Sequence, residues 1–389
     1  MITPIRNPLR QFLASGAIST DPALPPEAIE FVEYGSGDDA VEIVTTFGNL
    51  GLEYSSIRKA AGLIDLPHRA IVEVGGKDRH TFLGAMLTNQ TYDKQAKTGL
   101  AAGAGVYSFL LNGKGRIVAD MNLLELGDRL YLDIDDRLAG PVVSTLEKYI
   151  FSEQVKFTRR VDLHQLAVHG PGAAAVLGRA GADVADLVKP LHGKAVELLG
   201  QMAWLYRDDP CGVPGYVLVV PEAAVVDLWK HLVTPYVEQT NKRELRPVGW
   251  LAFNTTRIEA GRPLYGIDFD DTVLPAESGR FEEAVSVTKG CYLGQEVVAR
   301  MYARQQVARK VVGLRVDDGK LPIAGSAVYD ETKQPVGVIS SSTVSPTLSN
   351  AAIAIALVKK PWFEIGKRVL VPAEGEFVSA TVVRMPFVA

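Results

Sequence analysis

The sequence predicts an α+β fold, and three observations support that prediction. Apolar segments at residues 105–111, 117–126 and 130–134 are separated by the turn dipeptides Asn112-Gly113 and Gly127-Asp128, which is the pattern of an antiparallel meander. Strand signals and helical spacing then follow in a mixed order, without a regular strand–helix alternation. From residue 311 onward the pattern changes to short apolar segments, which are typical of a small β-barrel.

Local patterns define the individual elements. A strand signal at residues 70–74 ends at Gly75-Gly76, and the apolar residues of segment 78–87 recur at helical spacing. Two further groups of strands, each with a helix, follow the meander. The other expected elements are a helix at 138–150, a strand at 163–168, a turn at 170–172, strands at 203–205 and 215–220, helices at 223–233 and 297–306, and barrel strands at 311–316, 327–329, 336–340, 351–358, 368–372 and 378–384.

The composition excludes several classes of protein. The 41 basic and 45 acidic residues give a net charge of −4, so no global charge excess favours nucleic acid, and 47 % apolar content argues against disorder. Only two cysteines are present, Cys211 and Cys291, which excludes a disulfide framework and a CxxC site. A reducing cytosol is therefore the expected compartment. Apolar runs such as residues 351–358 fall far short of the ~20 residues of a membrane span, so we expect no membrane partner.

Other common chemistries lack their motifs. Residues 170–175 formally fit G-x-G-x-x-A, but His192 stands near the position of the ribose-binding acid. No P-loop, HExxH or G-x-S-x-G motif is present, so we expect no metal site and no serine hydrolase activity. Direct nucleic-acid binding is not favoured either, because a solvated helix face explains the local basic run better. That run consists of Arg300, Arg304, Arg309 and Lys310.

The densest functional signal surrounds Cys291. Glycines on both sides, Gly290 and Gly294, free the backbone around this thiol. If a helix begins at Gly294, its unpaired amides together with Lys289 favour an anion nearby, and Cys291 becomes a candidate reactive thiol. The alternative is a small buried hydrophobic residue in a tight bend.

Asp120 is the second candidate. It lies in the otherwise apolar segment 117–126, and period-two alternation places it on the same strand face as Asn122. A carboxylate there can face a cavity, hold a ligand amine or act as a base. The alternative is a solvent-facing strand residue.

From about residue 47 to the end, the chain resembles the glycine-cleavage T-protein superfamily, and within it the YgfZ branch. The YgfZ signature K-G-C-Y-x-G-Q-E stands at residues 289–296, where T-proteins typically have a cysteine-free sequence. Supporting matches lie at residues 87–90, 106–108, 115–121, 257–261, 263–266 and 345–348. The specified signature residues are Lys289, Gly290, Cys291, Tyr292, Gly294, Gln295 and Glu296.

The resemblance implies a three-domain cloverleaf around a central folate site, with tetrahydrofolate or a one-carbon derivative as the cofactor. It implies folate contacts from Asp120, Tyr107, Asn89 and Arg257, with Cys291 and Asp120 as candidate catalytic residues. The expected division is an N-terminal lead-in at 1–46, which contains three closely spaced prolines, a folate-binding core domain at 47–162 and 245–306, a second α+β domain at 163–244, and a C-terminal β-barrel at 307–389.

Two functions follow from the two branches. YgfZ-like proteins support iron–sulfur cluster assembly or repair and thereby tRNA modification, which implies transient iron–sulfur protein partners and a cytoplasmic location, or the mitochondrial matrix in a eukaryote. T-proteins transfer an aminomethyl unit from a lipoyl carrier protein to tetrahydrofolate. Val213 stands where they have a folate-contacting glutamate, and Phe253-Asn254 replaces an Arg-Asp pair. Because valine cannot accept hydrogen bonds from a pterin, the sequence favours the YgfZ-type function, with an aminomethyltransferase or another folate-linked one-carbon transferase as the alternative.

Overall fold

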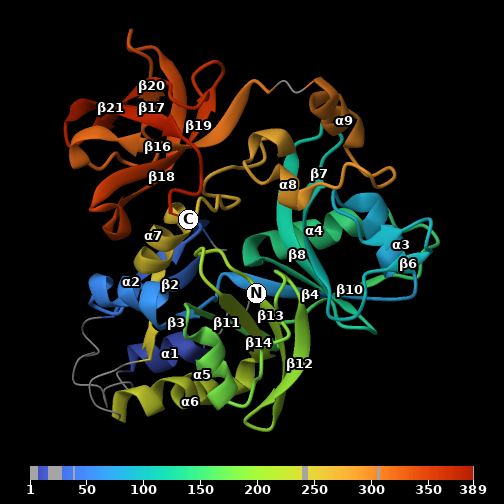
Figure 1. Cartoon of the computed structure of the whole chain (residues 1–389). Coiled ribbons are helices and arrows are strands. Elements are labelled where there is room, and N and C mark those ends of the chain that lie inside the picture. The colour runs from blue at the N-terminus through green and yellow to red at the C-terminus, as the bar shows by residue number, and fades with distance from the viewer. Residues whose placement is uncertain (1–7, 16–28, 38–39, 239–243, 305–306, 389) are drawn as a thin grey trace.

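The chain forms three lobes around a common centre. A computed structural model describes residues 8–15, 29–37, 40–238, 244–304 and 307–388. Figure 1 shows one lobe built on a five-stranded sheet, a second on a six-stranded sheet, and a barrel formed by the C-terminal residues. The predicted α+β class with a C-terminal barrel is confirmed.

The five-stranded sheet contains the predicted meander. Its order is β10-β4-β9-β8-β7, and all neighbours are antiparallel. Helices α3 (Arg79–Met86) and α4 (Asp136–Glu147) pack their apolar residues with those of the sheet in one core cluster. The strands are β4 (Arg69–Gly75), β7 (Gly105–Leu111), β8 (Ile117–Glu125), β9 (Leu130–Asp135) and β10 (Lys156–Arg159).

The six-stranded sheet has the order β12-β13-β14-β11-β3-β15, and only the β15–β3 pair is parallel. Helices α5 (Ala173–Arg179) and α6 (Val225–Glu238) contribute to its core cluster. The strands are β3 (Ala61–Asp65), β11 (Leu163–His169), β12 (Gly193–Leu198), β13 (Gln201–Arg207), β14 (Gly215–Pro221) and β15 (Leu245–Pro247).

The sheets do not follow the domain division expected from the sequence. Strands β3 and β15, assigned to the core domain, belong to the same sheet as the second domain, because β3 pairs with β11. The lead-in also needs correction, since its described residues form α1 (Pro8–Ala14), β1 (Glu30–Tyr34) and β2 (Val41–Thr46). Fully buried Leu9 and Leu13 join the core of the six-stranded sheet, a packing that no local signal in a proline-containing segment reveals.

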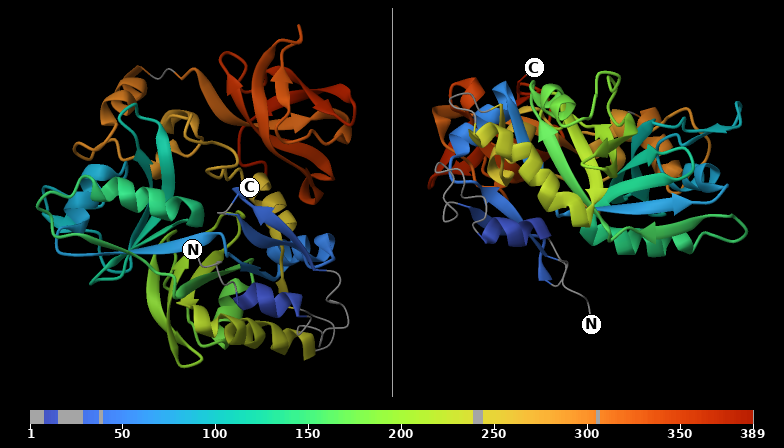
Figure 2. Two further views of the ribbon diagram at one scale, coloured as in Figure 1. Left: turned by 180° about the vertical axis from the view of Figure 1, so that it is seen from behind. Right: turned by 90° about the horizontal axis from the view of Figure 1, so that it is seen from below.

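The C-terminal barrel is closed, with the strand order β16-β19-β18-β17-β20-β21. Its strands are β16 (Arg309–Val316), β17 (Ala327–Tyr329), β18 (Pro335–Ser345), β19 (Ala351–Lys359), β20 (Arg368–Ala373) and β21 (Glu376–Val383). After β21 the chain returns to the centre, where the amide nitrogen of Phe387 donates to the carbonyl oxygen of Glu259 at 2.9 Å (Figure 2).

The remaining elements connect the lobes. Helices α2 (Leu50–Lys59) and α7 (Trp250–Glu259) pack together, and α7 also contacts β18 of the barrel. Helix α9 (Gln295–Arg304) is the one expected at 297–306, whose last two residues lie outside the described part of the chain. The short elements are β5 (Tyr92–Asp93), β6 (Thr98–Gly99) and α8 (Phe281–Ala284). Within the described ranges, every helix is too short or too polar to span a membrane.

Candidate functional site

A cavity lies where the two sheets meet. The space between its lining side chains is ≈ 840 Å³, a volume that includes the part open to solvent. The five-stranded sheet contributes residues of β7, β8 and β9, the six-stranded sheet those of β11, β13 and β14, and helix α7 two aromatic rings. The lining residues used below are Tyr34, His68, Arg69, Tyr107, Asp120, Asn122, Asp133, Gln165, His169, Tyr206, Asp208, Trp250, Phe253, Arg262 and Arg280.

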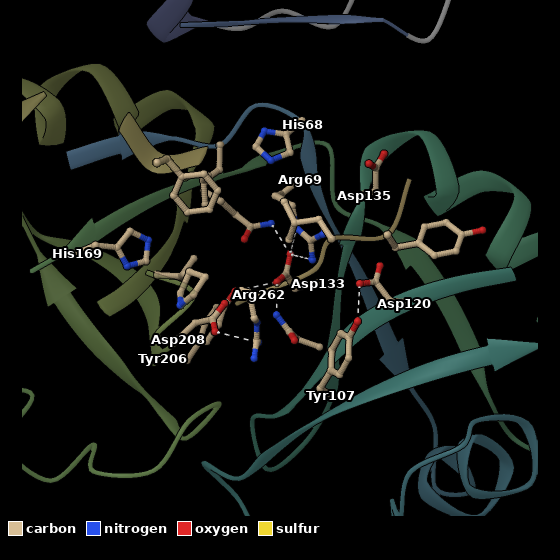
Figure 3. A pocket seen from close by; sticks show the side chains of 18 of the residues that line it. His68, Arg69, Tyr107, Asp120, Asp133, Asp135, His169, Tyr206, Asp208 and Arg262 are labelled. Atoms are coloured by element: carbon tan, nitrogen blue, oxygen red, sulfur yellow. Dashed lines mark hydrogen bonds and ion pairs between the residues drawn. The ribbon is translucent and has the colours of Figure 1, made fainter. Parts of the chain in front are cut away.

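Asp120 and Tyr107 form a hydrogen-bonded pair in this cavity (Figure 3). On the β7–β8 ladder Tyr107 pairs with Asn122 and Asp120 pairs with Phe109, so the two residues are diagonal neighbours. The Tyr107 hydroxyl donates to Asp120 Oδ2 at 2.7 Å. Burial, reinforced by the Asp120 charge, raises the pKa of Tyr107 well above its ordinary value, so the phenol remains a donor. In the hydrogen bonds of the described residues Asp120 accepts through Oδ2 alone, which leaves Oδ1 for a ligand.

Asp133 organises the centre of the cavity. Its carboxylate is 2 % exposed and accepts hydrogen bonds from Asn122 (2.9 Å), Gln165 (3.1 Å) and Tyr206 (2.8 Å), and it pairs with Arg69 at 2.9 Å. Burial alone would raise the pKa of this carboxyl, but Arg69 and the hydrogen bonds outweigh burial and hold the pKa below its usual value. Asp133 is therefore a fixed anion that orients its neighbours.

The pKa of Asp208 is shifted in the opposite direction to that of Asp133. Asp208 follows β13, lines the cavity, and its closest cation is Arg262, with Nη2 at 3.6 Å from Oδ1. Burial raises the pKa of Asp208, and the charge of Asp133 adds to that effect. A carboxyl with a raised pKa in a cavity is suited to proton transfer or to binding N–H groups.

Two guanidinium groups lie near the Tyr107 side of the cavity. Arg280 is 3 % exposed, stacks over the Tyr107 ring at 3.8 Å from its centroid, and donates to Glu283 at 2.9 Å. Arg262 also pairs with Glu283. A guanidinium group can bind a carboxylate through two parallel N–H···O bonds, so these arginines can bind the carboxylate tail of a ligand.

Two of the residues expected to contact folate lie outside the cavity lining. Asn89 donates from Nδ2 to the carbonyl oxygens of Tyr107 and Glu283, both at 2.8 Å, and so braces the strand that carries Tyr107. Arg257 is fully buried, with its guanidinium bonded to Asp268 at 2.6 Å and to Ser341 of the barrel at 2.7 Å. The donors of both side chains are bonded within the protein, and contact of either residue with folate stays a prediction.

The Cys291 motif also lies apart from the cavity, since none of residues 289–296 belongs to its lining. Lys289 Nζ donates to the carbonyl oxygens of Gly84 (2.8 Å) and Asn89 (2.9 Å), and burial with the nearby Lys94 lowers the pKa of Lys289 to about 7. Cys291 itself is exposed, so the buried alternative is wrong. Its role as a reactive thiol stays a prediction.

The sequence analysis missed much of the cavity wall. Tyr34 comes from the expected lead-in, and Trp250 and Arg280 from segments without a recognised motif. Gln165 and His169 do carry a local signal, since residues 165, 167 and 169 share one face of β11 by period-two alternation. Among the described residues, no group of three or more His, Cys, Asp and Glu side chains could hold a metal ion.

Comparison with known proteins identifies the family. The model of the GCVT N-terminal domain matches residues 31–289, and that of the glycine cleavage T-protein C-terminal barrel domain matches residues 309–389. The chain belongs to the glycine-cleavage T-protein family. Members of this family use tetrahydrofolate, which is the predicted cofactor.

Curated relatives are similar in sequence to this chain over nearly their whole length. The chain is similar to an aminomethyltransferase of Staphylococcus carnosus, with 28 % identity over 363 residues, 91 % of this chain and 93 % of the relative. It is 30 % identical to an aminomethyltransferase of Saccharopolyspora erythraea over 341 residues, covering 86 % and 89 %. These relatives support the aminomethyltransferase alternative better than the YgfZ-type interpretation that the sequence favoured.

A solved structure shows the same fold. The glycine cleavage system aminomethyltransferase T from Bartonella henselae superposes with a TM-score of 0.82 at 24 % identity, covering 98 % of this chain and 97 % of that one. The likeness extends over both sheets and the barrel, so it confirms the expected T-protein architecture.

Proposed function

We propose that the cavity binds tetrahydrofolate or a one-carbon derivative, and that the protein is a folate-dependent aminomethyltransferase of the T-protein type. The observation that carries this proposal is the Tyr107–Asp120 pair, placed in the cavity between the two sheets in a chain of this family. The family resemblance implies folate contacts from these two residues, and they are the two of the four expected contacts that line the cavity.

The lining fits the chemistry of a reduced folate. Such a ligand combines a flat ring with N–H donors and a tail with carboxylates. Asp120 and Asp208 supply acceptors for N–H groups, the rings of Trp250 and Phe253 supply flat apolar surface, and Arg280 supplies a cation. The loss of an acceptor at Val213 is thereby offset, because Val213 lies outside the lining whereas the Asp208 carboxyl lies within it.

Aminomethyl transfer requires proton movement at these carboxyl groups. The folate supplies two nucleophilic N–H nitrogens, which become bonded to the transferred carbon while ammonia and a thiol leave. Two protons must therefore pass from the folate nitrogens to the leaving amine and the thiolate. Asp120, whose Oδ1 accepts no hydrogen bond from the described residues, is placed to accept a proton, and Asp208, with its raised pKa, is placed to retain and return one.

Binding is tested by titrating the protein anaerobically with tetrahydrofolate and with its methylene and formyl forms. We expect Asp120→Asn and Tyr107→Phe to weaken binding, because each removes one partner of the pair. Asp317→Asn is the control, since this residue pairs with Arg368 on the exposed barrel surface. Absence of binding by every reduced folate contradicts the proposal.

Activity is tested with an aminomethyl-loaded lipoyl carrier protein and tetrahydrofolate. We expect methylene-tetrahydrofolate and ammonia to form, and Asp120→Asn to lower the rate by about 10²-fold or more, as removal of a general base does. Folate binding without turnover would leave the binding site in place and exclude the aminomethyltransferase.

One observation favours the second candidate, a YgfZ-type role in iron–sulfur cluster assembly or repair. Cys291 is exposed within its signature, whereas Cys211 is fully buried and burial raises its pKa to about 12. One accessible thiolate cannot supply the four that a stable cluster usually requires, so any cluster contact would be shared with a partner.

The second candidate is tested with Cys291→Ser in a strain defective in cluster-dependent enzymes. We expect the variant to keep its folding and folate affinity but to lose rescue. Asp120→Asn provides the converse comparison, because it alters the cavity and leaves the thiol in place. Full rescue by the serine variant contradicts this role.

A further inference from the structure

The end of helix α3 is closed by a segment far away in the chain. The last carbonyl groups of a helix have no partner within it and need donors from outside. Residues 286–293, which include Cys291, supply them. The amide of Leu293 donates to the carbonyl oxygen of Ala85 at 3.2 Å, and the amide of Ser286 donates to that of Thr88 at 3.1 Å.

Lys289 forms the centre of this cap. Its Nζ donates to the carbonyl oxygens of Gly84 at 2.8 Å, of Asn89 at 2.9 Å and of Leu87. Among the described residues these carbonyls are its hydrogen-bond partners, and none of them is a carboxylate. An ammonium group has three N–H donors, whereas a neutral amine has two donors and a lone pair. Three carbonyl oxygens at the end of a helix therefore fit the charged form.

The capped segment runs along the edge of β7, the strand that carries Tyr107. The Thr88 amide donates to the Phe109 carbonyl oxygen at 3.0 Å, and the Phe109 amide donates to Thr88 Oγ1 at 2.9 Å. Next to them, Asn89 Nδ2 donates to the carbonyl oxygen of Tyr107 at 2.8 Å. Asn89 thus accepts from Lys289 through its backbone and donates to the Tyr107 backbone through its side chain.

We propose that Lys289 is a positioning residue, which fixes Asn89 and thereby holds Tyr107 where its phenol donates to Asp120. The motif around Cys291 then acts on the cavity from outside its lining. The effect on a ligand rests on the proposed folate function, because that function makes the Tyr107–Asp120 pair a contact for tetrahydrofolate. The effect on Tyr107 itself is independent of any ligand.

The surroundings of Lys289 make its charge testable. Burial and the like charge of Lys94 lower the pKa of Lys289 to about 7, and Lys94 Nζ lies against Gly290, where a Cβ would stand 2.7 Å from it. The ring of Tyr292 is centred 4.9 Å from Lys289 Nζ, and burial raises its pKa to about 12. Near pH 7 the loss of a proton therefore removes one donor from the cap. The charged groups of the neighbouring segments are bonded elsewhere: Glu283 to Arg262 and Arg280, Arg79 and His80 to Glu125, and Asp93 to the amides of Gln95 and Ala96.

The first test follows the Tyr107 ring without a ligand, by ¹³C NMR of protein labelled at tyrosine Cζ and assigned with Tyr107→Phe. The pKa of Tyr107 lies well above its ordinary value, so a change of its signal around neutral pH reports a neighbour. We expect a step centred near pH 7 in the wild type, and its loss in Lys289→Met. Lys94→Gln should move the step to higher pH, because removal of a like charge raises the pKa. Cys291→Ser is the control in the same loop and should keep the wild-type step.

The second test measures tetrahydrofolate affinity across the same pH range. We expect Lys289→Met to bind about tenfold more weakly below pH 7, a loss that corresponds to about one hydrogen bond. The difference should narrow above pH 7, because the wild-type amine is then neutral as well. Cys291→Ser should bind like the wild type at every pH. A residue that only stabilises the fold would give no such pH profile.

The outcomes separate this proposal from the folate function. If Lys289→Met keeps the step in the Tyr107 signal, or Lys94→Gln leaves its midpoint unchanged, another group causes the step and the proposal is wrong. If the step behaves as expected but the wild type binds no reduced folate, Lys289 positions Tyr107 and the folate function fails. If the step is lost and the folate affinity stays unchanged, Tyr107 is positioned but is not a folate contact. Should Lys289→Met fail to fold, the wild type and Lys94→Gln decide, since Lys94 is exposed.

Discussion

At the scale of the residue, burial fixes the protonation state of the groups around the cavity. Asp133 is kept ionised by Arg69 and three hydrogen-bond donors, whereas burial raises the pKa of Asp208. His169 is kept neutral by burial alone. The cavity thus presents acceptors of different basicity within one site, which is the arrangement that proton transfer to and from a ligand requires.

The neutral state of His169 predicts a pH dependence of stability. Its pKa falls from 6.5 in the unfolded chain to about 4 in the folded protein, so between these values the unfolded chain binds more protons. Stability therefore falls as the pH drops from 6.5 to 4, by roughly 3 kcal/mol from this residue at about 1.4 kcal/mol per unit. Urea unfolding at pH 7 and pH 4.5 should show a smaller loss for His169→Phe than for the wild type. An equal loss in both proteins would mean that the imidazole is already accessible to protons.

At the scale of the element, the motif around Cys291 holds the hairpin that carries the Tyr107–Asp120 pair. Gly294 lies just before α9 with φ +79°, and a Cβ there would stand 2.7 Å from the carbonyl oxygen of Asn112 in the β7–β8 turn. A Cβ on Gly115 of the same turn would likewise stand 2.7 Å from Val297 Cβ. Close packing of α9 against the turn thus leaves no room for a Cβ at either position, and both glycines have positive φ.

This packing predicts the effect of Gly294→Ala. The left-handed backbone costs about 1–2 kcal/mol for any residue with a Cβ, and the contact with Asn112 adds to that cost. We expect lower stability in urea unfolding and weaker tetrahydrofolate binding, because displacing the turn moves the strands of Tyr107 and Asp120. Gly113→Ala is the matched control in the same hairpin, since a Cβ there meets nothing within 4 Å. Equal stability of the two variants would show that α9 can move away from the turn.

Local periodicity explains which elements and site residues the sequence could predict. The meander, the barrel strands and the position of Asp120 follow from alternation and turn residues within a few positions. Tyr34, His68 and Trp250 could not be predicted, because they meet at the cavity only through tertiary packing of segments far apart in the chain. Arg257 illustrates the same limit of local patterns: a polar residue in a motif can serve a ligand or the fold, and only its partners distinguish the two.

At the scale of the whole molecule, α7 joins the lobes. Its N-terminal end contributes Trp250 and Phe253 to the cavity, and its C-terminal end holds the barrel through Arg257. Arg257 and Asp268 are both fully buried, and Asp268 also accepts from Ser340 and Ser341 of β18 at 2.7 and 2.6 Å. The barrel is therefore attached to the centre of the molecule through a buried ion pair with hydrogen-bonded partners.

This attachment predicts that Arg257 acts on stability and not on ligand contact. Arg257→Met leaves the Asp268 carboxylate buried without its cation, and removal of one partner of a buried pair costs about 3–5 kcal/mol. We expect a corresponding loss in urea unfolding and an unchanged tetrahydrofolate affinity per folded molecule at low temperature. Arg368→Gln is the control, because its pair with Asp317 is half-exposed and such pairs contribute about 0–1 kcal/mol. The contrary outcome is that Arg257→Met is as stable as the control but binds tetrahydrofolate weakly. The guanidinium would then serve the ligand. The barrel would be held by the apolar contacts of α7 and by the returning C-terminal segment, where the Phe387 amide donates to the Glu259 carbonyl oxygen.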